Sequence, residues 1–157
     1  MKIYLDTSAF VKNYHTEQGS DRIELIFEHA KKGKCSLFMS IWGISETINA
    51  LDKHRMRNEI TQDELNKIVG TILSDISELM DKNILEIIDI ETELLKMSWE
   101  FIINEHLSCS DSLHLVTALQ KNCDIFLAAD RNFIKIAKKK INAYDVESEE
   151  INLNQEQ

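Results

Sequence analysis

Proline is absent from this chain of 157 residues, and glycine occurs only four times. Because these two residues form the tight turns between short strands, their scarcity argues against a sandwich of many strands and favours helices with short connections. No apolar run approaches the ~20 residues that a transmembrane helix needs. The opening MKIYLDTSAF is interrupted by Asp6 and lacks the pattern of a secretory signal. We therefore expect no contact with a membrane.

The motifs of several common functions are also missing. The three cysteines, Cys35, Cys109 and Cys123, form no CxxC pair and have no zinc-ligand spacing, and their odd number suits a reducing, cytoplasmic environment. Neither GxxxxGK[ST] nor GxGxxG occurs, which excludes the common phosphate-binding loops. The net charge is 18 − 27 = −9, so the chain as a whole has no general attraction for nucleic acid.

The residues that are present predict one domain in which strands and helices alternate. Hydrophobic residues make up 43% of the chain, which is enough for a sizeable core. The order of elements predicts an α/β sandwich with a mostly parallel central sheet over residues 1–146, followed by an acidic, frayed tail over 147–157. Strands are expected over 2–5, 35–40, 84–89, 125–129 and 141–146, and helices over 8–14, 20–32, 43–57, from Thr61, from Thr92, 111–121 and 131–139.

Local patterns also predict helix starts and buried faces. Ser20 and Ser110 are each expected to cap the helix that follows. Thr61 is expected to begin a long helix, with Glu64 completing a capping box. Both tryptophans are expected in the core, and the inward residues of the helix from Thr92 are expected to be Leu94, Leu95, Trp99, Ile102 and Ile103, with Trp42 buried elsewhere.

Acidic residues are expected at the edge of the sheet where ligands bind. Asp6 follows the first strand, and Asp130 follows the almost wholly apolar strand over 125–129. In an open α/β sheet, ligands bind beyond the carboxyl ends of the strands, so these two acids can converge. Asp111 begins a helix that is apolar nearly all round, which turns the acid toward a cleft. Glu46 lies early in the helix after the second strand.

Four acids in such places predict a metal site. Carboxylates within a few ångströms of one another need a cation to stay ionised, and all-oxygen ligand sets favour Mg²⁺ or Mn²⁺. A metal so held activates water, binds a scissile phosphate and stabilises the leaving oxygen, so that no histidine or lysine is needed as a base. The residues therefore suggest phosphodiester cleavage, with the ion held by Asp6, Glu46, Asp111 and Asp130.

Each acid also has a purely structural interpretation, which the pattern leaves open. Asp111 fits a first-turn acid that the helix dipole favours. Asp6 and Asp130 fit caps of the following helices, and Glu46 fits a solvated helix residue. His114 is expected to be a hydrogen-bonded core histidine rather than a ligand. A small basic cluster is either a solvated helix end or a contact to an RNA backbone; it consists of Lys53, His54, Arg55 and Arg57.

Four segments, in order, resemble the motifs of the PIN-domain family: LDTSAF, ISETINAL, SDSLHLVTAL and FLAADRNF. The resemblance extends over about residues 2–146. It implies a three-layer α/β/α sandwich and a Mg²⁺- or Mn²⁺-dependent ribonuclease, with Asp6, Glu46, Asp111 and Asp130 as the site acids and Thr7 and Ser8 supporting the first of them. In one departure, Ala128 stands where the family often has Thr or Ser, which removes a hydroxyl that could orient a ligand or water.

The short chain also resembles the toxin of VapBC-type toxin–antitoxin pairs. Such toxins are usually homodimers that a small antitoxin inhibits, although stand-alone PIN proteins have the same length. The resemblance thus implies an RNA substrate, an antitoxin partner and a homodimer. A PIN-like RNA- or protein-binding module without useful catalysis remains an alternative, which the net charge and Ala128 favour. An aspartyl phosphatase is disfavoured, because it requires an acid where Ser8 stands.

Overall fold

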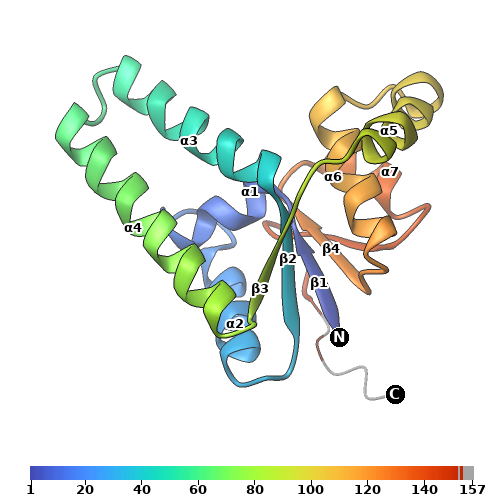
Figure 1. The fold of residues 1–157 in the computed structure, drawn as a ribbon, viewed down its shortest axis with the longest axis horizontal. Helices are drawn as coiled ribbons and strands as arrows, with labels where there is room; N and C mark the ends of the chain where they lie inside the picture. Colours follow the sequence, from blue (N-terminus) through green and yellow to red (C-terminus); the bar gives the residue numbers. More distant parts are fainter. Residues whose placement is uncertain (152, 154–157) are drawn as a thin grey trace.

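The computed structural model of this chain describes residues 1–151 and 153, and its centre is a sheet of five strands with helices on both faces (Figure 1). All four strand pairings are parallel, and the spatial order is β3-β2-β1-β4-β5. The expected α/β/α sandwich with a mostly parallel sheet is therefore confirmed. The strands are β1 Lys2–Leu5, β2 Ser36–Ser40, β3 Leu85–Ile88, β4 Ile125–Ala128 and β5 Asn142–Asp145.

The helices form two groups, one on each face of the sheet. The segment from α1 to α4 packs with one face in one hydrophobic cluster, and α5 to α7 pack with the other face in a second cluster. Figure 1 shows the two groups on opposite sides of the sheet. The helices are α1 Thr7–Phe10, the 3₁₀ helix η1 Val11–Asn13, α2 Ser20–Lys31, α3 Ile41–Met56, α4 Gln62–Asp81, α5 Thr92–Glu105, α6 Cys109–Gln120 and α7 Arg131–Ala137.

The central strands are buried on both faces, which is why their sequences are apolar without interruption. In β1, Ile3 and Leu5 join the cluster under α1 to α4, whereas Tyr4 joins the cluster under α5 to α7. This division follows from the alternation of side chains along a strand. All four residues of β4 are buried in the same alternating manner. The carboxyl ends of β1 and β4 consequently lie side by side, since Leu5 pairs with Leu127.

Two of the expected helix caps are displaced in the structure. Gly19, and not Ser20, is the N-cap of α2, with a positive φ of 91°. Side chains rarely adopt this conformation, and a Cβ at this position would lie 2.4 Å from the carbonyl oxygen of Val146. Ser108, and not Ser110, caps α6 by accepting a hydrogen bond from the N–H of Asp111. The capping box between Thr61 and Glu64 is confirmed.

The burial expected for both tryptophans is wrong. Trp42 is 45% exposed and Trp99 is 57% exposed. In α5, Leu94 is buried as expected, but the inward side continues through Ser98 and Phe101. The other residues expected to face inward lie roughly 100° or more round the helix from the buried side that Leu94 and Phe101 define. Leu95 and Ile103 are exposed and Ile102 is half-buried, so that an apolar stripe faces outward; we call Leu95, Trp99 and Ile103 the α5 stripe.

The chain beyond β5 turns back over the start of α2. Asp145 accepts hydrogen bonds from the N–H of Glu147 and the hydroxyl of Ser148. Glu147 is paired with the buried ammonium of Lys12 at 2.9 Å, and Glu149 with Lys138 at 2.7 Å. Of the segment expected to form an acidic tail, residues 152 and 154–157 lie outside those that the structure describes. Within the described ranges, none of the helices has the length and apolar character that a membrane span requires.

Candidate active site

Acidic residues from four elements meet at the carboxyl edge of the sheet. Asp6 follows β1 directly, and its N–H donates to the carbonyl of Leu127 in β4 at 2.9 Å. Asp130 comes two residues after the end of β4. Glu46 approaches from α3 and Asp111 from the first turn of α6. The site therefore lies at the junction of β1 with β4, between the two groups of helices.

Asp6 is held firmly by the residues that follow it. Its carboxylate is nearly buried, and its Oδ2 accepts from the N–H of Ser8 at 3.0 Å and from the Ser8 hydroxyl at 2.6 Å. The same hydroxyl accepts from the N–H of Ala129 at 2.9 Å. Ser8 thus ties the first acid to the end of β4. The Oδ1 atom of Asp6 faces His114, whose Nε2 lies 3.4 Å away.

Glu46 is not a solvated helix residue, because both of its oxygens are engaged. Oε1 accepts from the hydroxyl of Ser110, and Oε2 accepts from the Thr7 hydroxyl at 2.7 Å and from His114 Nε2 at 2.7 Å. Burial raises the pKa of Glu46, but the hydrogen bonds from His114, Ser110 and Thr7 lower it to about 2. Glu46 is therefore an oriented carboxylate that keeps its charge in mildly acidic solution.

His114 lies between Glu46 and Asp6 and contacts both. It is 1% exposed, as expected for a hydrogen-bonded core histidine, and its Nδ1 lies 2.9 Å from the hydroxyl of Tyr4. The Tyr4 oxygen also accepts from the N–H of Ser40. In the neutral ring with its proton on Nε2, the Tyr4 hydroxyl donates to Nδ1, and in the charged ring Nδ1 donates to Tyr4; in both forms Nε2 donates toward Glu46. Burial opposes a charge on the ring, yet the carboxylates of Asp6 and Glu46 raise the pKa of His114 above its ordinary value.

The absence of a side chain at Gly43 lets α3 come this close to α6. A Cβ there would lie 3.2 Å from His114 Cε1, 3.2 Å from Thr7 Oγ1 and 2.5 Å from the end of Met39. These contacts are tighter than ordinary packing allows. The small residue one turn before Glu46 therefore permits that acid to reach His114.

Asp111 and Asp130 are less constrained than the other two acids. Burial raises the pKa of Asp111, a hydrogen bond involving Ser108 lowers it, and the nearby charges of Asp6 and Asp130 raise it further. Asp130 is exposed and caps α7, with Oδ1 accepting from the N–H groups of Asn132 and Phe133 at 2.8 and 2.9 Å. The pKa of Asp111 is therefore raised chiefly by burial, with smaller contributions from the charges of Asp6 and Asp130.

The chemistry of these donors fits a hard divalent cation. A cluster of mutually repelling carboxylate oxygens is the ligand type that Mg²⁺ and Mn²⁺ prefer. Within residues 1–151 and 153, however, no three acidic, histidine or cysteine side chains are gathered closely enough to coordinate one ion as they stand. Asp130 is exposed and Asp111 is only partly buried, so neither side chain is enclosed by close packing as Asp6 is.

Two other expectations about the site concern its borders. Ala128 is fully buried in the hydrophobic cluster under α5 to α7. As an alanine, it offers no hydroxyl there. The basic cluster lies at the far end of α3, where Arg55 pairs with Asp52 at 2.7 Å and His54 with Glu59 at 2.5 Å. At 1.5 Å per residue, Arg57 lies roughly 16 Å along the helix from Glu46. Two members of the cluster are thus paired within the protein.

Ser110, Trp42 and Arg131 are neighbours of the site that the sequence did not single out as functional. Ser110 accepts a hydrogen bond from the Trp42 indole at 3.0 Å and donates to Glu46. Arg131 follows Asp130 and is 77% exposed, with its Nε 3.4 Å from the buried carboxylate of Asp145. For Ser110 and Arg131 the one sequence signal is adjacency, since Ser110 precedes Asp111 and Arg131 follows Asp130; Trp42 has no such signal.

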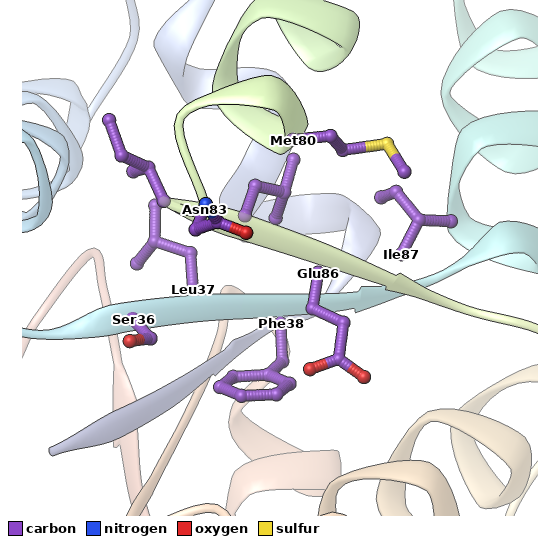
Figure 2. A pocket seen from close by; sticks show the side chains of 9 residues that line it. Ser36, Leu37, Phe38, Met80, Asn83, Glu86 and Ile87 are labelled. Carbon is purple, nitrogen blue, oxygen red and sulfur yellow. The ribbon is translucent and has the colours of Figure 1, made fainter.

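A hollow beside the sheet is separate from the four acids. It has a volume of about 370 Å³ and lies beside the edge strand β3 (Figure 2). Leu37, Phe38, Met80 and Ile87 are among the residues around it, and none of the four site acids lines it.

Comparison with known proteins agrees with the fold. The family model of the PIN domain matches residues 3–139. The comparison with curated proteins found no match. Among solved structures, the chain is similar to VapC20 of Mycobacterium tuberculosis, described as a sarcin–ricin loop cleaving toxin, with 14% identity, a TM-score of 0.61, and 85% of this chain and 94% of that chain covered.

Two further solved structures are complexes. VapBC2 of Rickettsia felis, bound to a promoter DNA fragment, is 18% identical with a TM-score of 0.61, over 92% of this chain and 98% of that chain. FitAcB of Neisseria gonorrhoeae is 12% identical with a TM-score of 0.65, over 92% of this chain and 97% of that chain. At these identities the likeness concerns the fold.

The effect of removing the charge of Asp111 on stability tests whether this acid belongs to a cluster of carboxylates or only stabilises the first turn of its helix. Asp111→Asn should raise the free energy of unfolding in EDTA by about 0.5–1 kcal/mol at neutral pH, because it removes a charge that burial and two carboxylates disfavour. Asp21, the exposed first-turn acid of α2, is the matched control. Asp21→Asn should lower the same quantity by about 0.3–1 kcal/mol, because it removes a favourable interaction with the helix dipole.

Denaturant unfolding followed by circular dichroism measures both changes. A loss of stability in Asp111→Asn equal to that in Asp21→Asn would mean that Asp111 serves only its helix.

Proposed function

Because the chain belongs to the PIN domain family, we propose that it is a metal-dependent endoribonuclease that hydrolyses RNA phosphodiester bonds. The observation that supports the proposal is the placement of Asp6 and Asp130 directly beyond the paired strands β1 and β4, with Asp111 in the first turn of α6. Such a cluster is costly for stability unless a cation neutralises it. Its position at the junction of two neighbouring parallel strands is where α/β sheets bind ligands.

The four acids have different proposed roles. Asp6, Asp111 and Asp130 would hold Mg²⁺ or Mn²⁺, with Asp6 fixed by Ser8 and the other two able to adjust. When bound, such an ion supplies an activated water and neutralises charge on the scissile phosphate. Glu46, with both oxygens engaged, would remain ionised and orient a water or the ion from the α3 side.

RNA as the substrate is supported by the family and opposed by the net charge of −9. A bound divalent ion would offset part of this negative charge at the acids, where the RNA phosphate would bind. VapC20, with the same fold, is described as cleaving the sarcin–ricin loop. We assign this chain to RNA cleavage without assigning its target sequence.

We further propose that the protein is the toxin of a toxin–antitoxin pair and that it forms a homodimer in the cytoplasm. The solved structures of VapBC2 and FitAcB support an antitoxin partner by analogy of fold. The α5 stripe supports a second copy, because three large apolar side chains on one outward helix face are a surface that proteins usually cover. Three free cysteines agree with a reducing compartment.

Cleavage of RNA by matched variants tests the enzyme. The wild-type protein should cleave single-stranded RNA in Mg²⁺ or Mn²⁺ and not in EDTA, and Asp6→Asn should lower the rate about 100-fold or more, because it weakens the carboxylate that Ser8 fixes at the centre of the cluster. Asp124, at the opposite end of β4, is the control, and Asp124→Asn should cleave at the wild-type rate. Gel analysis of labelled RNA measures the rates.

Metal-dependent cleavage that is equal in Asp6→Asn and the wild type would exclude the proposed mechanism. RNA binding with no cleavage in any divalent metal would instead favour a PIN-like binding module.

Expression in a bacterial host tests the toxin. Induction of the wild-type chain should arrest growth, because uncontrolled RNA cleavage stops translation, and Asp6→Asn at the same protein level should not. Co-expression of the small protein encoded beside this chain should restore growth, as measured by colony counts. Normal growth with the wild-type chain, despite RNA cleavage by the purified protein, would indicate a stand-alone nuclease.

A further inference from the structure

Trp42 stands at the rim of the acid cluster and not in the core. α3 begins at Ile41, directly after the last residue of β2, which places its first turn at the carboxyl edge of the sheet. The Trp42 side chain is on the surface, and its Nε1–H donates to Ser110 at 3.0 Å. Because Ser110 in turn donates to Glu46, only two hydrogen bonds separate the indole from a site acid.

This anchoring determines what Trp42 can offer a ligand. The indole has a single hydrogen-bond donor, and that donor is used within the protein. What remains for a ligand is aromatic surface, held in one orientation by a hydrogen bond from α3 to α6. An aromatic ring that is fixed before binding loses little conformational entropy when a ligand stacks on it.

The surroundings of Trp42 differ from those of the other exposed tryptophan. Trp99 lies between Leu95 and Ile103 in the α5 stripe, which is a surface suited to another protein chain. The anchor of Trp42, Ser110, is instead adjacent to Asp111 in the chain and bonded to Glu46. A ligand stacked on Trp42 would therefore lie close to Glu46 and Asp111.

We propose that Trp42 is a stacking platform for a nucleobase of single-stranded RNA, next to the phosphate that the acid cluster engages. This inference rests on the proposed ribonuclease function. Bases of single-stranded RNA are free to stack on aromatic side chains, and stacking tolerates any sequence. It also requires no positive charge, which suits a chain of net charge −9 that cannot attract RNA by general electrostatics.

Intrinsic fluorescence in EDTA tests the stacking without any cleavage. The chain has two tryptophans, so Trp99→Phe leaves Trp42 as the single indole. A single-stranded RNA octamer of mixed sequence should quench its emission. An abasic octamer, which keeps the phosphates and lacks the bases, is the matched control and should not. Equal quenching by both octamers would overturn the proposal, because binding would then depend on the phosphates.

Affinity measurements on three proteins separate stacking from support of Ser110. In the wild-type background, Trp42→Ala should raise the Kd for the RNA octamer about 5- to 150-fold. Trp42→Phe should stay within about 3-fold of the wild type, because it keeps an aromatic ring and loses only the bond to Ser110. An unchanged Kd in Trp42→Ala would overturn the proposal. So would a shift from dimer to monomer in Trp42→Ala by analytical ultracentrifugation, which would place Trp42 in a protein interface.

Kinetics distinguish failure of this inference from failure of the proposed function. With Mn²⁺ present, Trp42→Ala should raise KM and leave kcat within about 3-fold, since the contact is made to bound RNA before and during cleavage. Cleavage that depends on Asp6 but has the same KM in Trp42→Ala would refute the platform alone. Base-dependent quenching of Trp42 without cleavage by the wild type would refute the nuclease and retain the platform.

Discussion

The arrangement of the site depends on the buried imidazole of His114. Its Nε2 is 2.7 Å from Glu46 and 3.4 Å from Asp6, so one ring nitrogen of α6 faces a carboxylate from α3 and another from the end of β1. Without a donor between them, these acids would repel each other in a partly buried place. Tyr4 fixes the ring from behind, and Gly43 leaves room for α3 to approach it. Asp6 and Glu46 are thus positioned by hydrogen bonds and packing within the protein.

Much of this arrangement could be predicted from local patterns. The apolar runs before Asp6 and Asp130 identified both strands, and parallel pairing of β1 with β4 brings their ends together. The sequence could not reveal the partners of Glu46, because its bonds to Thr7 and His114 join residues 39 and 68 positions away. Such contacts arise only from the packing of α3 against α1 and α6.

The errors concern two helix caps and the buried faces of helices, whereas the order of helices and strands was predicted correctly. The helical period was found correctly in α5, but the wrong arc was assigned to the core, because apolar residues occupy more than half of its circumference. Leu95 and Trp99 compete with Leu94 and Phe101 for burial, and only the position of α6 decides between them. Trp42 was also expected in the core, but it is exposed. Its hydrogen bond to Ser110 explains how a large ring is kept at the surface beside a charged site.

The central claim is that Asp6, Asp111 and Asp130 form one site for a divalent ion. Anomalous diffraction from a crystal soaked in Mn²⁺ tests it most directly. The account predicts one peak at the carboxyl edge of β1 and β4, within about 2.2 Å of an oxygen of Asp6 and of at least one of the other two acids. Full-occupancy manganese elsewhere, with none at this edge, would contradict the claim.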